Sequence, residues 1–95
     1  MFKKKIEITE DAKNELDESV KWYEKRKKGL GKEFKNEVKK TIKSIEQNPE
    51  QNQKVSDNEN IRRALIDRFP FFIFYYIKQT TIKIFSIFHT SRNPK

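Results

Sequence analysis

The side chains that could carry out chemistry are mostly cationic and lie in the second half of the chain. The strongest candidates are four arginines and the single histidine: Arg62, Arg63, Arg68, His89 and Arg92. Cleavage of RNA through a 2′-hydroxyl needs a general base, a general acid and cations that neutralise the charge of the transition state. The candidates offer the cations and one acid or base, and Glu46 is a distant candidate for a second base. The residue types therefore allow phosphodiester chemistry.

The spacing of these residues predicts which of them can act together. Arg62 and Arg68 have the same parity, so a regular strand would place both side chains on one face of a sheet. Arg63 would then lie on the other face, with Asp67. His89 follows the last predicted strand, and it can reach the end of the sheet that holds Arg68 if the strands form a meander.

Each candidate also has a purely structural interpretation. Arg62 and Arg63 can form a solvated strand edge, or they can pair with the carboxylates of Asp57, Glu59 or Asp67. A lone histidine beside the end of a strand is more often a hydrogen-bonded structural residue than a catalyst. The arginine in the C-terminal tail can belong to a flexible segment. Residue type alone does not separate these interpretations.

The composition predicts one small domain, residues 1–95, with an anionic partner. The chain has 22 basic and 14 acidic residues and a net charge of +8, which favours nucleic acid, a ribonucleoprotein, an acidic protein or a membrane surface. One histidine and no cysteine argue against a structural zinc site, and we expect neither a metal nor a cofactor. Gly29-Leu30-Gly31 joins two predicted helices and lacks a third glycine, so it is not a phosphate-binding loop.

The hydrophobic segments are too short for targeting or for a membrane. The basic residues that follow Met1 precede no apolar stretch, so no signal peptide is predicted. The longest apolar run, Phe69 to Ile77, is far shorter than the roughly 20 residues that span a bilayer. We therefore expect a cytoplasmic protein without a membrane partner.

Two amphipathic helices are predicted in the first half of the chain. Thr9 can cap the first helix, whose apolar residues recur at helical spacing from Ala12 to Tyr23. The basic run 25–28 and Gly29 are typical of a helix C-terminus, which is a better interpretation of this run than a nucleic-acid clamp. A second apolar stripe covers residues 30–45, and the short connection predicts an antiparallel hairpin.

Strands are predicted before and after this hairpin. Weak alternation indicates a first strand at residues 2–8, and Asn48-Pro49 ends the second helix. The almost wholly polar residues 49–60 predict a mobile loop. The β-branched and aromatic composition beyond it predicts three further strands, near residues 61–67, 69–78 and 81–88.

The predicted central strand is apolar on both of its faces. One face has Phe71, Ile73, Tyr75 and Ile77, and the other has Phe72, Phe74 and Tyr76. The last strand behaves alike, with Ile82, Ile84 and Phe88 opposed to Phe85 and Ile87. Two adjacent helices can cover only one face. The second face is then covered by the polar loop, the C-terminus or the first helix, or it binds a partner, for which an acidic chain that folds on binding is suitable.

Short motifs along the chain resemble the RelE/ParE superfamily of bacterial toxins. Trp22-Tyr23-Glu24 and Gly29-Leu30-Gly31-Lys32-Glu33-Phe34 resemble its helical hairpin. The later motifs, in family order, are Ile45-Glu46-Gln47-Asn48-Pro49, Ile61-Arg62-Arg63-Ala64-Leu65, Arg68-Phe69-Pro70-Phe71, Tyr75-Tyr76 and His89-Thr90-Ser91-Arg92-Asn93-Pro94. Together they span nearly the whole chain, and they are most similar to the ParE-like and plasmid-stabilisation branch.

The resemblance implies a fold, a partner and a choice of targets. The fold is α+β, with an N-terminal strand, an antiparallel helical hairpin and a three-stranded antiparallel meander. The partner is an antitoxin, usually encoded by the adjacent gene, and we expect it to bind Phe72, Phe74 and Tyr76. ParE-like members inhibit DNA gyrase, whereas RelE-like members cut messenger RNA on the ribosome.

The late part of the chain departs from both branches. RelE-like nucleases commonly use a tyrosine or histidine near the C-terminus, and here His89 is the only late candidate. ParE-like members often have an aromatic residue after the final proline, whereas this chain has Lys95. We therefore predict a ParE-like gyrase inhibitor. The alternatives are a ribosome-dependent endoribonuclease, with Arg68 and His89 as catalytic residues, and a non-toxic binding module. In either toxin, the cations that would bind the target or nucleic acid are Arg62, Arg63 and Arg92.

Overall fold

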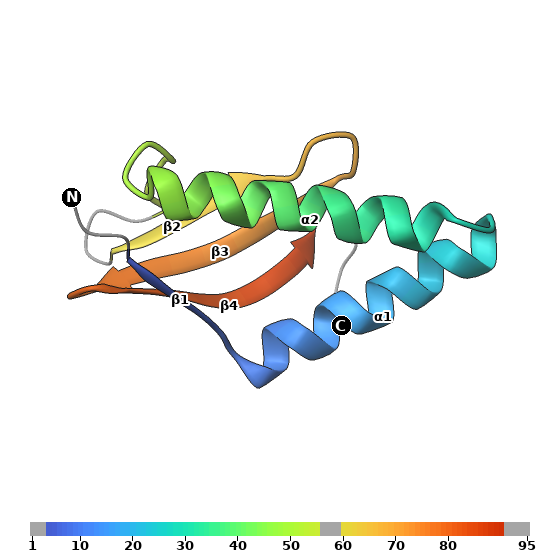
Figure 1. The fold of residues 1–95 in the computed structure, drawn as a ribbon, viewed down its shortest axis with the longest axis horizontal. Helices are drawn as coiled ribbons and strands as arrows, with labels where there is room; N and C mark the ends of the chain where they lie inside the picture. Colours follow the sequence, from blue (N-terminus) through green and yellow to red (C-terminus); the bar gives the residue numbers. More distant parts are fainter. Residues whose placement is uncertain (1–3, 56–59, 91–95) are drawn as a thin grey trace.

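The computed structural model describes residues 4–55 and 60–90. Its elements, in chain order, are β1 (Lys5–Ile8), α1 (Glu10–Arg26), α2 (Leu30–Gln47), β2 (Ile61–Leu65), β3 (Phe71–Lys78) and β4 (Thr81–His89). The helices form an antiparallel hairpin that packs against a four-stranded sheet (Figure 1). The predicted α+β class is confirmed. No helix in the described part of the chain is long and apolar enough to cross a membrane.

The local signals around α1 act as predicted. The Thr9 hydroxyl accepts a hydrogen bond from the Ala12 amide at 3.2 Å, which caps the N-terminus of the helix. Acidic side chains occupy the first turn and basic ones the last, where each sign is favoured by the helix dipole. Gly29 then takes a left-handed conformation, with φ of 89°, and the chain reverses direction.

Glu24 closes the helical hairpin. Its carboxylate accepts hydrogen bonds from the backbone amides of Gly29, at 2.9 Å, and Gly31, at 3.0 Å. These amides lie at the positive N-terminus of α2, which a carboxylate stabilises. The two helices also approach closely at Gly31, because a Cβ atom there would lie 2.6 Å from the Val20 carbonyl oxygen. The motifs Trp22-Tyr23-Glu24 and Gly29-Leu30-Gly31 therefore lie at one contact between the two helices.

The sheet has the order β1-β4-β3-β2. Strands β2, β3 and β4 form the predicted antiparallel meander. Strand β1 adds to it in parallel with β4, from Lys5 opposite Thr81 to Ile8 opposite Ile84, so the sheet is mixed and four-stranded. Beyond the end of β1, the Glu15 carboxylate of α1 accepts a hydrogen bond from the Ile87 amide at 2.8 Å. A helix side chain thus satisfies a strand donor that β1 does not reach.

The hydrophobic core lies between the hairpin and one face of the sheet, here called the helix face. Tyr23, Phe34, Phe69 and Phe71 form a cluster in which the ring centroids of neighbouring pairs lie 4.7–6.1 Å apart. The other large buried hydrophobic side chains are aliphatic except for Tyr75: Val38, Ile45, Ile66, Ile73, Tyr75, Ile82, Ile84 and Ile87. Aromatic residues therefore fill the region where both helices meet the end of the sheet.

A bulge in β4 changes one prediction. Phe74 pairs with Ser86 and Tyr75 pairs with Ile84, so one extra residue is accommodated in β4. Ile87 is consequently buried on the helix face with Ile84. Phe88 lies opposite Phe72, on the other face. The predicted faces of Ile87 and Phe88 were wrong, because simple alternation does not allow for an extra residue.

The segment before β2 is anchored where a mobile loop was predicted. The Tyr75 hydroxyl donates a hydrogen bond to the Pro49 carbonyl oxygen at 2.6 Å and accepts one from the Asn52 amide at 3.1 Å. The Val55 amide donates to the Ile61 carbonyl oxygen at 2.7 Å. Residues 49–55 form the predicted loop, with these contacts to β3 and β2, and residues 56–59 lie outside the described part of the chain.

Candidate functional site

Aromatic rings form a connected cluster on the sheet face opposite the helices, here called the open face. The ring centroids of Phe72 and Phe74 are 6.0 Å apart, and Phe85 lies 6.3 Å from Phe74 and 5.8 Å from Tyr76. All four side chains are partly exposed. Phe85 joins this face at the bulge, although the sequence placed only its neighbours in β3 at the partner site. The result is one surface formed by both central strands.

Basic and apolar side chains of β2 border the aromatic cluster. Arg63 lies opposite Phe74, and its guanidinium carbon is 4.4 Å from the centroid of the Phe72 ring. Leu65 lies opposite Phe72 and is 62% exposed, the highest value among the large hydrophobic side chains of the described residues. Arg63 therefore points to the open face, as its parity predicted. A cation and a large apolar side chain lie together beside the rings, which suits a protein partner.

The described residues leave the open face uncovered. Both helices pack against the helix face (Figure 1). The loop residues 49–55 contact Tyr75 and the outer edge of β2. The helices and loop residues 49–55 therefore do not cover the open face in place of a partner. Residues 91–95, and Arg92 with them, lie outside the described part of the chain.

Arg62 points to the helix face, where it holds the loop. It lies opposite Tyr75, and its Nη1 donates hydrogen bonds to the carbonyl oxygens of Asn52, at 2.6 Å, and Glu50, at 3.1 Å. The predicted partners Asp57 and Glu59 lie outside the described residues. The observed contacts give Arg62 a structural role.

Arg68 lies in a turn and not in a strand. Strand β2 ends at Leu65, and Arg68 has a φ of 72°, a left-handed conformation that is rare for a residue with a side chain. Its guanidinium contacts Glu33 Oε1 at 2.8 Å and Glu37 Oε2 at 3.1 Å. Hydrogen bonds, first to Glu33 and then to Glu37, raise the pKa of Arg68. The turn is thereby fixed to α2.

His89 does lie at the end of the sheet that holds Arg68. It pairs with Phe71, and the two rings meet edge to face with their centroids 5.1 Å apart. The following amide, of Thr90, donates to the Pro70 carbonyl oxygen at 2.7 Å. The proximity predicted from a meander is confirmed.

The structure does not assemble the full cationic cluster that the parity argument predicted. Arg62 lies opposite Tyr75, whereas His89 lies opposite Phe71, four residues along β3. At about 3.3 Å per residue, this places them roughly 13 Å apart along the strand. Asp67 also departs from the prediction, because it lines a groove beside α2 and does not share the open face with Arg63. The parity argument fails for Arg68 and Asp67 because the chain leaves the strand at residue 65.

The comparisons with known proteins agree with this geometry. Residues 6–94 match the family model described as the ParE toxin of the type II toxin-antitoxin system, parDE. The chain belongs to this family. A chain of the solved structure "Chromosomal ParDE TA system from P. aeruginosa" has the same fold, with a TM-score of 0.76 and 22% sequence identity over 93% of this chain and 97% of that one. No curated protein sequence matches the chain. The predicted resemblance to ParE-like toxins is confirmed.

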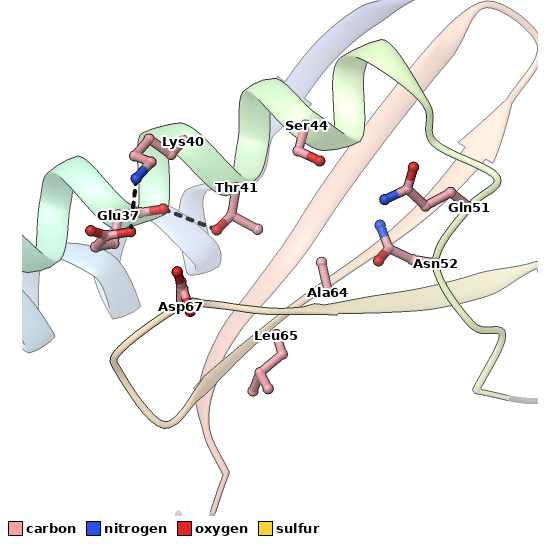
Figure 2. A pocket seen from close by; sticks show the side chains of 9 residues that line it. All are labelled: Glu37, Lys40, Thr41, Ser44, Gln51, Asn52, Ala64, Leu65 and Asp67. Carbon is pink, nitrogen blue, oxygen red and sulfur yellow. Dashed lines mark hydrogen bonds and ion pairs between the residues drawn. The ribbon is translucent and has the colours of Figure 1, made fainter.

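This ParE-family chain also has a polar groove between α2 and β2, with a volume of about 270 Å³. Figure 2 shows the carboxylates of Glu37 and Asp67 near one end of it and the side-chain amides of Gln51 and Asn52 near the other. Glu37 is already bound by Arg68 and by Lys40, at 3.7 Å. The groove was not predicted from the sequence, because its walls come from α2, from the loop before β2 and from β2 with the turn after it, and only the packing of these segments brings them together. No group of three or more potential metal ligands occurs within residues 4–55 and 60–90.

Proposed function

We propose that this ParE-family toxin inhibits growth by binding DNA gyrase, and that a cognate antitoxin neutralises it by covering the open face. The observation that supports the antitoxin site is the aromatic surface of Phe72, Phe74, Tyr76 and Phe85, which the described helices and loop leave uncovered. Apolar surface of this kind on a small soluble chain marks an interaction site.

The border of the open face supports an acidic partner. Arg63 lies over the ring of Phe72, so an arriving carboxylate can pair with its guanidinium while an apolar side chain packs on the rings. Leu65, at 62% exposure, offers a further apolar contact. An antitoxin segment with alternating acidic and apolar residues could pair with Arg63 and also pack on Leu65 and the rings. Its folding on the toxin would bury the aromatic cluster.

The contacts of the cations support inhibition by binding over RNA cleavage. Arg62 holds the loop, and Arg68 holds the turn on the carboxylates of Glu33 and Glu37. A nuclease needs cations aimed at the scissile phosphate, and these two are occupied by other parts of the same chain. Ribosome-dependent cleavage that uses His89 is the alternative outcome of the test below.

The target is tested by inducing the chain alone in growing cells and measuring two properties. We expect plasmid supercoiling to be lost while transcripts stay intact, as gyrase inhibition requires. Cuts in translated messages, in phase with codons, would contradict the proposal and support the nuclease. Normal growth with undamaged DNA and RNA would identify a non-toxic binding module.

The antitoxin site is tested with two variants that add the same charge. Phe74→Arg places a cation in the centre of the open face, and Gln47→Arg places one at the exposed end of α2. The probe is the protein encoded by the adjacent reading frame, which we expect to be short and acidic and to restore growth. We expect Phe74→Arg to weaken its binding about 30-fold or more, as for the disruption of a central anchor in an interface, and Gln47→Arg to bind normally. Equal binding by both variants would exclude the open face.

A further inference from the structure

The positive charge of this chain is concentrated in one segment. Residues 21–43, from the end of α1 through most of α2, contain ten lysines and arginines and three glutamates, a net charge of +7. The whole chain has a net charge of +8. The remaining residues are therefore close to neutral, and the electrostatic attraction of the protein comes from its helical hairpin.

The three glutamates of this segment are engaged in the fold. Glu24 binds the amides at the start of α2, and Glu33 and Glu37 bind the guanidinium of Arg68. Of the ten basic side chains, Lys40 alone has a carboxylate of the described residues within salt-bridge distance. The described part of the chain therefore leaves most of the lysine charge available to a partner.

The lysines face solvent in rows. On α2, Lys32, Lys39 and Lys43 recur at helical spacing, on the side opposite Phe34 and Val38 of the core. On α1, Lys21 and Lys25 lie one turn apart, and Lys28 follows in the connection. We define the hairpin lysine surface as these six residues, all of them exposed. The closed end of the hairpin projects beyond the sheet, so a large partner can reach it (Figure 1).

The row on α2 has the dimensions of a nucleic-acid contact. The eleven-residue separation of Lys32 and Lys43 corresponds to about 16 Å along the helix. A DNA strand has one phosphate per about 3.4 Å of axis, so the row extends past roughly five phosphates. Flexible ammonium groups match such an array without a fixed geometry.

We propose that the hairpin lysine surface binds the phosphate backbone of a nucleic-acid duplex. Protein interfaces are depleted in lysine and use aromatic anchors, whereas this surface consists of lysines. The neighbouring exposed aromatic side chain, Trp22, has the guanidinium of Arg26 over its ring. The open face, on the other side of the sheet, has the opposite composition. Backbone contacts made by lysine fix position but select no sequence. This site is separate from the open face and does not depend on gyrase being the target.

The structure confirms that the basic run 25–28 lies at the C-terminus of α1. Helix α1 ends at Arg26, so Lys27 and Lys28 lie beyond its last turn. Arg26 is set apart from the lysines, because its guanidinium carbon lies 4.3 Å from the centroid of the Trp22 ring. The chain then turns at Gly29 into α2, so Lys28 lies in the connection between the two helices.

The test compares two triple variants with the same change in net charge. Lys25→Gln, Lys32→Gln and Lys39→Gln together remove half of the hairpin lysine surface, whereas the control changes exposed lysines elsewhere: Lys5→Gln, Lys54→Gln and Lys78→Gln. Each purified full-length protein is titrated against fluorescein-labelled DNA and RNA duplexes of about 20 base pairs, at salt concentrations from about 50 to 200 mM. Matching melting temperatures would show that the substitutions leave the fold intact.

We expect the hairpin variant to bind about tenfold or more weakly at about 0.1 M salt, and its log–log salt dependence to be shallower by about 0.9 for each phosphate that the protein no longer neutralises. The control should stay close to the unchanged protein. Binding to the DNA duplex, the RNA duplex or both supports the inference and identifies the source of the backbone. Equal weakening in the control would overturn it, since net charge alone would then explain the binding. Tighter binding of polyglutamate than of either duplex at equal charge concentration would overturn it in favour of an acidic protein. No binding to either duplex would also overturn it.

Discussion

The two faces of the β-sheet are both apolar in sequence, yet they differ in what covers them. On β3, Phe71, Ile73 and Tyr75 are at most 2% exposed, because the hairpin packs on them. Phe72 and Phe74 alternate with these residues and stay partly exposed. The short connection between α1 and α2 keeps the helices together on one face. The sequence alternation therefore predicts two apolar faces, and the two helices cover only one of these faces.

The polar contacts of the two faces differ in the same way. On the helix face, the hydroxyl of Tyr75 and the guanidiniums of Arg62 and Arg68 have partners within the chain. No buried side-chain nitrogen or oxygen among the described residues lacks a hydrogen-bond partner. On the open face, the guanidinium of Arg63 lies over an aromatic ring. The cations of the helix face stabilise the fold, while Arg63 is placed to meet a partner.

The largest expected contrast is between one phenylalanine of the core and one of the open face. Phe34 is fully buried, so Phe34→Ala should lower the free energy of unfolding by about 3–5 kcal/mol. Phe74→Ala should cost less than about 1.5 kcal/mol, because the side chain is already partly hydrated. Denaturant unfolding measures both values. Equal losses of stability would mean that another part of the same chain covers the open face.

A smaller effect is expected from the two neighbouring tyrosines. Tyr75→Phe leaves the Pro49 carbonyl oxygen without its donor and should cost about 1–2 kcal/mol. Tyr76→Phe, on the open face, should stay within about 0.5 kcal/mol of the unchanged protein. Thermal unfolding of the two variants at neutral pH separates them. A greater loss of stability for Tyr76→Phe would contradict the conclusion that the Tyr75 hydroxyl anchors the loop.

The pH dependence of stability provides a second test of Tyr75. Burial raises the pKa of Tyr75 above its ordinary value of 10.0. Above that value the unfolded tyrosine loses its proton while the folded one keeps it, so the folded state binds more protons and stability falls as pH rises. The stability advantage over Tyr75→Phe should be complete below pH 10 and should shrink as pH rises above it. A constant difference between pH 9 and 11 would show that Tyr75 is not shielded.

The smallest expected change in stability distinguishes the arginines. Arg68→Ala should lower the melting temperature, because Glu37, which is 7% exposed, loses its closest cation. Arg63→Ala should leave the melting temperature unchanged and weaken antitoxin binding instead. Arg68→Gly provides a control: Arg68→Ala keeps a Cβ atom at the φ of 72° and so isolates the loss of the ion pairs, whereas glycine also removes the backbone strain and should cost less. If Arg68→Ala abolishes toxicity at an unchanged melting temperature, Arg68 belongs to the functional site.

The sequence predicts the elements well and the candidate site in part. The two helices, the hairpin between them and the strands of the meander follow from periodicities that neighbouring residues define. The orientation of Phe72, Phe74 and Tyr76 toward one face was also predictable, because β3 has regular alternation. The position of Arg68 was not, because a turn ends β2 before parity reaches it. The face of Phe85 was predictable in the same way, whereas the faces of Ile87 and Phe88 depend on the bulge, for which β4 has no local signal.

The sequence by itself therefore determined which segments are helices and strands, which residues of β3 share a face, and that a second apolar face would need a cover. These properties depend on contacts and spacings within a few residues. The tertiary structure alone decided that β1 pairs in parallel with β4 and that loop residues 49–55 are held by Tyr75 and Arg62. Each of these depends on pairing between segments that are distant in the chain, and the packing of the whole core selects that pairing.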